Sequence, residues 1–95
     1  MSHEVVRMPA SDSLRIRFSM TEDRVTVPLD GYTLRVLVMS DPQVDISVDG
    51  AGAYSYVTIP KNAIGTPGLY AAEISADNGA QRHTQPFRLR VDAHP

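Results

Sequence analysis

Apolar and polar residues alternate along much of this chain, which is the pattern of half-buried β-strands. Residues 14–20 begin the pattern, with one apolar face formed by Leu14, Ile16, Phe18 and Met20. The alternation recurs over residues 24–29, 44–48 and 54–59, and residues 32–39 are apolar enough for a central strand. Because no segment sustains a helical period for three turns, the pattern predicts an all-β fold.

The last third of the chain predicts a structural corner. Pro67 and Gly68 precede a strand in which Tyr70, Ala72 and Ile74 share one face. In immunoglobulin-type sandwiches, a tyrosine near the start of the sixth strand caps such a corner through its hydroxyl group. We therefore expect Gly68 and Tyr70 to fix the corner and to play no catalytic role.

A hairpin is expected to follow this corner. The tight-turn residues Asp77, Asn78 and Gly79 predict it, and its loop can extend through residues 83–85 before a closing strand over residues 87–91. The whole chain has 95 residues, close to the roughly 100 residues of one sandwich domain. The predicted fold is an immunoglobulin-like antiparallel β-sandwich of about seven strands.

The N-terminal segment predicts an assembly element. Residues 1–12 form a polar, proline-broken arm ahead of one domain over residues 13–95. The arm holds Val5, Val6 and Met8, which have too few local neighbours to become buried. We therefore expect it to add a strand to the sheet edge of an adjacent subunit, where backbone hydrogen bonds provide affinity. Two alternatives stay open: the segment is the first strand of the same domain, or it is disordered.

Composition and charge exclude several classes of function. The chain has no cysteine, which removes thiol nucleophiles, cysteine-ligated metal sites and disulfides. Nine Lys and Arg against eleven Asp and Glu give a net charge of −2, so we expect no nucleic-acid partner. No signal peptide or membrane-spanning run is visible in the sequence, so we expect synthesis in the cytosol and no membrane partner.

The residues with catalytic or metal-binding chemistry lack the spacing that such chemistry requires. The histidines are His3, His83 and His94. None of them is spaced to place two imidazoles on one metal ion. Acidic residues recur every four positions at Asp41, Asp45 and Asp49. A calcium loop needs closer oxygen ligands and a closing glutamate. A nominal hydrolase triad is Ser55, His83 and Asp77. No nucleophile elbow surrounds this serine, so we expect no catalytic residue. Because neither the histidines nor the aspartates have the spacing of metal ligands, we also expect no metal ion, and we expect no cofactor.

Two sets of side chains remain as interaction candidates. The outward arginines are Arg15, Arg17, Arg35, Arg88 and Arg90. They form either a patch for an acidic partner or a solvated face that deters edge aggregation. Tyr54 and Tyr56 can stack on sugar rings or pack across strands. Because the chain has no tryptophan, cross-strand packing is the favoured role of these two tyrosines.

Several motifs between residues 14 and 91 carry a family resemblance. They are an arginine-rich first strand, Tyr-Thr-Leu-Arg-Val from residue 32, a Tyr-x-Tyr strand from residue 54, Gly-Thr-Pro-Gly-Leu-Tyr-x-x-Glu-Ile from residue 65, and Pro-Phe-Arg-Leu-Arg-Val from residue 86. In this order they resemble the N-terminal immunoglobulin-like domain of phage baseplate upper proteins. In that family the domain is a virion building block that joins other tail proteins.

The resemblance implies a non-enzymatic structural protein of a phage virion, acting through protein–protein contacts as a tail or baseplate adaptor or a capsid decoration. Its expected partners are other virion proteins and further copies of itself, and its expected location is the virion after synthesis in the host cytoplasm. The chain departs from the family because no coiled coil or receptor-binding module precedes its end at Pro95, which favours a free-standing accessory protein. The alternative is a carbohydrate-binding or adhesion module from a larger exported protein.

Overall fold

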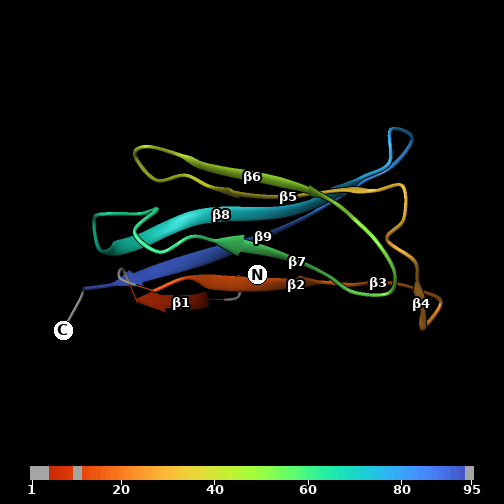
Figure 1. Ribbon diagram of the computed structural model, residues 1–95, viewed down its shortest axis with the longest axis horizontal. Coiled ribbons are helices and arrows are strands. Elements are labelled where there is room, and N and C mark those ends of the chain that lie inside the picture. Colours follow the sequence, from red (N-terminus) through yellow and green to blue (C-terminus); the bar gives the residue numbers. More distant parts are fainter. Residues whose placement is uncertain (1–4, 10–11, 94–95) are drawn as a thin grey trace.

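The computed structural model describes residues 5–9 and 12–93, and every regular element in them is a β-strand. The strands are β1 (Val5–Pro9), β2 (Leu14–Phe18), β3 (Met20–Glu22), β4 (Val25–Val27), β5 (Thr33–Val38), β6 (Val44–Asp49), β7 (Ser55–Ile59), β8 (Gly68–Asp77) and β9 (Arg82–Asp92). Five of them form a sheet in the order β1-β9-β8-β5-β6, while β2 pairs with β7 and β3 pairs with β4 (Figure 1). The predicted all-β fold is confirmed.

The hydrophobic core lies between the five-stranded sheet and the β2–β7 pair. Alternation along β5 turns Leu34, Val36 and Val38 inward, and β7 contributes Val57 and Ile59 from the opposite layer. All five side chains are fully buried. Since full burial of a Val, Leu or Ile side chain stabilises by about 1.5–3 kcal/mol, these two strands hold the layers together. The molecule is a two-layered, sandwich-like structure with open sheets (Figure 1).

The N-terminal segment belongs to the domain. β1 pairs in parallel with β9 of the same chain, from Val5 opposite Arg88 to Pro9 opposite Asp92. Met8 is 1% exposed and lies in the core, whereas Val6 is half-buried and Val5 is exposed. This corrects the expectation of a free assembly arm at residues 5–9, because pairing with a distant strand supplies the neighbours that the segment lacks locally. Residues 1–4 and 10–11 of the expected arm lie outside the described residues.

The turn between β8 and β9 is where the sequence predicts it. The Asp77 carboxylate accepts a hydrogen bond of 2.7 Å from the Gly79 N–H. The Asn78 side-chain oxygen accepts hydrogen bonds from the N–H groups of Ala80 and Gln81, at 2.9 and 2.7 Å. Side chains thus take the place of backbone acceptors, which is how Asx turns favour Asp and Asn.

The closing strand is longer than predicted. β9 begins at Arg82, so residues 83–85 lie in the strand and not in the hairpin loop. Pro86 lies in the middle of β9 opposite Glu73 of β8, and no described residue of β1 is paired with it. A proline removes a ladder donor, which is tolerated at an open edge.

The strand predicted over residues 14–20 is divided at Ser19. Its last part is β3, which turns back onto β4 through Asp23 and Arg24. Both turn residues have positive φ, 49° and 66°, as a two-residue type I′ hairpin requires. β4 ends before Pro28, so the strand predicted over residues 24–29 is shorter than expected.

Candidate functional site

The outer face of the β2–β7 pair presents arginine and tyrosine side chains side by side. We call this surface the Arg–Tyr face and define it by Arg15, Arg17, Tyr54, Tyr56 and Thr58. Alternation places these residues outward because the residues between them face the core. In the antiparallel register, Arg15 lies opposite Thr58 and Arg17 opposite Tyr56.

Arg15 stacks diagonally on Tyr56 of β7, and Arg17 stacks on Tyr54, the residue just before β7. The guanidinium carbon of Arg15 lies 4.3 Å from the ring centroid of Tyr56, and that of Arg17 lies 4.8 Å from the ring centroid of Tyr54. An exposed cation–π contact of this kind stabilises by about 0.5–1 kcal/mol. The two contacts hold long side chains in defined positions, which lowers the entropy cost of binding a partner.

The face remains accessible and carries unneutralised positive charge. Tyr54 and Tyr56 are 52% and 46% exposed. Within the described residues, neither Arg15 nor Arg17 forms an ion pair with a carboxylate of this chain. Their guanidinium N–H groups therefore remain free to donate to an incoming carboxylate, the acceptor that matches their fork geometry best.

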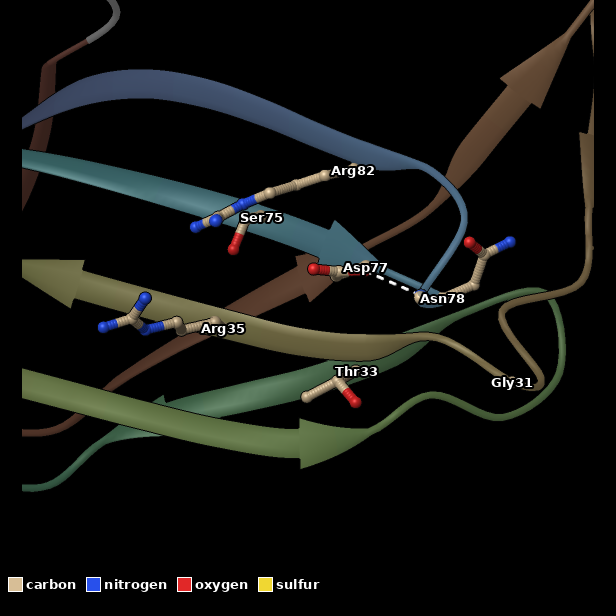
Figure 2. Close-up of a pocket in the computed structure, with 8 residues that line it drawn as sticks. Gly31, Thr33, Arg35, Ser75, Asp77, Asn78 and Arg82 are labelled. Atoms are coloured by element: carbon tan, nitrogen blue, oxygen red, sulfur yellow. Dashed lines mark hydrogen bonds between the residues drawn. The ribbon is translucent and has the colours of Figure 1, made fainter.

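A polar hollow of about 440 Å³ lies on the outer face of the other layer, beside the β8–β9 turn (Figure 2). Its lining includes Arg35, Ser75, Asp77 and Arg82. The Arg35 guanidinium donates two hydrogen bonds of 2.7 Å to the two carboxylate oxygens of Asp45. This bidentate pair holds the pKa of Asp45 below its usual value and raises the pKa of Arg35.

Two charged groups that line the hollow, Asp77 and Arg35, already interact with other groups of this chain. Asp77 accepts its hydrogen bond from the Gly79 N–H, as the dashed line in Figure 2 shows, and so serves the turn. Arg35 is neutralised by Asp45. Arg82 lies opposite Asp77 in the β8–β9 ladder, so each arginine of the lining has an acidic neighbour.

The predicted corner residues lie together. The Tyr70 hydroxyl donates a hydrogen bond of 2.5 Å to the backbone carbonyl oxygen of Thr66. The Tyr70 ring packs against the core, and a Cβ built at Gly68 would lie 3.7 Å from that ring. Gly68 and Tyr70 are therefore neighbours, and the Tyr70 hydroxyl ties the start of β8 to the preceding loop.

The other residues considered for chemistry are held in separate places. The Ser55 hydroxyl donates to the Ala51 carbonyl and accepts from the Ala51 N–H, both at 2.9 Å. The His83 ring lies 6.5 Å from the ring of Tyr32. His3 and His94 lie outside the described residues. Among the described residues, no three His, Cys, Asp or Glu side chains gather in a group that could hold a metal ion.

No family model matches this sequence, and a search of curated proteins gives no match. Over residues 5–9 and 12–93, no helix has the length and apolar character needed to cross a membrane. Within residues 5–9 and 12–93, the Arg–Tyr face combines exposed aromatic area with uncompensated charge.

The sequence patterns predicted both strands but did not predict that β2 pairs with β7. The alternating patterns placed Arg15, Arg17, Tyr54 and Tyr56 outward on their own strands. Some 40 residues separate the two strands, and only the register brings each guanidinium over a ring. The matched alternation of the two segments was the available signal, but it does not state which strands are neighbours.

Proposed function

We propose that this chain is a non-enzymatic structural protein that acts through protein–protein contacts, with the Arg–Tyr face as its principal binding surface. The observation that carries the proposal is the stacking of Arg15 and Arg17 on two exposed tyrosines. Tyrosine and arginine are, with tryptophan, enriched among the side chains that dominate the energetics of protein interfaces. A partner with exposed carboxylates and an apolar centre fits this surface.

The stacking favours a protein over a sugar as the ligand. A sugar ring binds by lying on the open face of an aromatic ring, and one face of Tyr54 and of Tyr56 is already covered by a guanidinium group. A sugar that used these covered faces would first have to displace the arginines, at the cost of the cation–π contacts. A protein carboxylate, by contrast, binds to the arginines where they are.

An immunoglobulin-like topology is part of the proposal. In that fold, the third, sixth and seventh strands form one sheet, extended by an additional strand beside the third, and the second and fifth strands face them. The order β9-β8-β5-β6 against β2-β7 matches this arrangement. The tyrosine at the start of β8, bonded to an upstream carbonyl, supports the same assignment.

We propose the phage virion as the setting, because the motif order resembles that of baseplate upper proteins. The partners would be other virion proteins and further copies of this chain, met after synthesis in the host cytoplasm. A small sandwich suits this role as an adaptor, a spacer or a decoration. The gene neighbourhood tests the setting: adjacent portal, capsid or tail genes support it, and an operon of exported enzymes contradicts it.

A binding experiment tests the function itself. The purified chain is immobilised and presented with the products of its neighbouring genes, alongside the variant Tyr54→Ala/Tyr56→Ala. A matched control removes exposed apolar side chains from the other layer, as Val5→Ala/Leu69→Ala. We expect a partner that binds the parent and the control, and binds the tyrosine variant about tenfold or more weakly. Equal binding by both variants would contradict the proposed surface.

The carbohydrate alternative keeps one supporting observation, the exposure of both tyrosines. It predicts binding on a glycan array that is lost in Tyr54→Ala/Tyr56→Ala. It also predicts that Arg17→Ala, which uncovers one face of Tyr54, strengthens sugar binding. The protein-binding proposal predicts no glycan binding by the parent and weaker protein binding by Arg17→Ala.

A further inference from the structure

Two strands at opposite places in the fold have unpaired edges with complementary patterns. β6 is the last strand of the five-stranded sheet, and β2 is the outer strand of the β2–β7 pair (Figure 1). Within the described residues, neither outer edge has a ladder partner. Unpaired edges are templates for pairing with another chain unless charge or geometry prevents it.

Both strands alternate inward apolar residues with outward polar residues, and the outward charges are positive on β2 and negative on β6. In β2, Leu14, Ile16 and Phe18 face the core while Arg15 and Arg17 face outward. In β6, apolar residues alternate with an outward row made of Asp45, Ser47 and Asp49, of which Asp45 is paired with Arg35 of β5 and Asp49 carries the unpaired charge within the described residues. Like charges directly opposite each other across a strand pair destabilise it, and opposite charges stabilise it. Pairing of either edge with the same edge of another copy therefore places like charges opposite each other. Pairing of a β2 edge with a β6 edge places opposite charges together.

Both edges also leave apolar surface uncovered. Leu14 and Ile16 on β2 are half-buried, as are Ile46 and Val48 on β6. Beside β2 lies a hollow of about 330 Å³, lined in part by Ile16, Arg17 and Phe87, so that the edge opens onto a cavity and not onto another strand. A neighbouring strand would cover the apolar row on one face and meet the charges on the other.

We propose that β2 of one copy of this chain pairs with β6 of a second copy, which joins the β2–β7 pair of the first to the five-stranded sheet of the second. An even register sets apolar residues beside apolar residues and the two arginines beside the Asp45, Ser47 and Asp49 row. The contact is heterologous, because the two surfaces differ. Repetition of such a contact produces a ring if the rotation closes and a filament if it does not.

This inference rests on the proposed function, protein–protein contact, and it names a second copy of the chain as one partner. The contact uses the edge of β2 and the side chains of Arg15 and Arg17, and it leaves Tyr54 and Tyr56 of β7 and its preceding turn exposed on the outer face. The Arg35–Asp45 pair is also kept, because its atoms lie within one copy. A different virion protein can bind the full Arg–Tyr face of a copy whose β2 edge is free, such as the terminal copy of an assembly, and the exposed tyrosines of the other copies.

The test reverses the charge of each edge in turn. The variant Arg15→Glu/Arg17→Glu makes both edges acidic, and the variant Ser47→Lys/Asp49→Lys makes both edges basic while sparing Asp45 for its ion pair. Oligomer size is followed by analytical ultracentrifugation across a wide range of protein concentration at low ionic strength. We expect the parent to self-associate, and each variant alone to do so roughly tenfold or more weakly. An equimolar mixture of the two variants should regain self-association, because each acidic edge then meets a basic one.

The control Arg88→Glu/Arg90→Glu makes the same change of charge on the outer face of β9 and should self-associate like the parent. Circular dichroism checks that every variant keeps the strand signal of the parent. A parent that stays monomeric at all concentrations would overturn the inference, as would a mixture of folded variants that stays monomeric. A monomeric parent that still binds a neighbouring gene product through its tyrosines would overturn the β2–β6 pairing between copies but would support the proposed function.

Discussion

Replacing Met8 with alanine removes a side chain that β1 inserts into the core. Met8 is 1% exposed and packs in the core cluster, although its segment lies near the start of the chain. Truncation of a buried methionine to alanine costs about 2–5 kcal/mol, because apolar contacts are lost and a cavity remains. A domain of this size has a total stability of about 5–15 kcal/mol, so the loss is a large share of it.

Urea denaturation followed by circular dichroism measures the effect as a lower midpoint with an unchanged slope. On heating, a loss of 2 kcal/mol corresponds to a fall in Tm of roughly 8 °C or more. The matched control is Val5→Ala on the same strand, whose side chain is 52% exposed and whose loss should cost no more than about 0.5 kcal/mol. Equal, small effects of Met8→Ala and Val5→Ala would refute the placement of β1 in the domain's own sheet.

Three further substitutions test separate parts of the structure. Tyr70→Phe removes the hydroxyl that bonds the corner carbonyl and should lower the free energy of unfolding by about 1 kcal/mol in urea denaturation, with a larger loss pointing to a second partner. Gly50→Ala places a Cβ 2.4 Å from the Leu29 carbonyl oxygen, so we expect a loss of about 1–3 kcal/mol, and an unchanged midpoint would contradict that close approach. The pKa of Asp45 is lowered in the folded state by its hydrogen bonds to Arg35, so the pair stabilises above the usual aspartate pKa of about 4 and this contribution disappears as the pH falls through the lowered value. The stability difference between the parent and Asp45→Asn should therefore shrink on acidification, and a difference that grows would reverse the sign of the argument.

The sequence patterns predicted those strands and turns whose formation depends on residues close together in the chain. Alternation over residues 32–39 and 54–59 identified β5 and β7, and the turn at Asp77 identified the hairpin, because each depends on neighbours within a few residues. The corner at Gly68 and Tyr70 was accessible for the same reason, since the hydroxyl reaches back only four residues.

Long-range pairing was not accessible in this way. The segment from Val5 to Pro9 acquires its role from a parallel ladder with β9, more than 80 residues away, and nothing in its short, irregular pattern specifies that partner. The same holds for the Arg–Tyr face, where Arg17 and Tyr54 meet only through the β2–β7 register. The division of a predicted strand at Ser19 arises because the short β3–β4 ribbon pairs with itself and leaves the sheet of β2.

The affinity of the chain for a protein partner shows whether the Arg–Tyr face is its principal binding surface. It is measured at physiological ionic strength between a neighbouring gene product and three forms of the chain: the parent, Tyr54→Ala/Tyr56→Ala, and Val5→Ala/Leu69→Ala. We expect Kd to rise about tenfold or more for the tyrosine variant and to stay near the parent value for the control. A partner that binds all three forms equally, or a parent that binds a glycan and no protein, would contradict it.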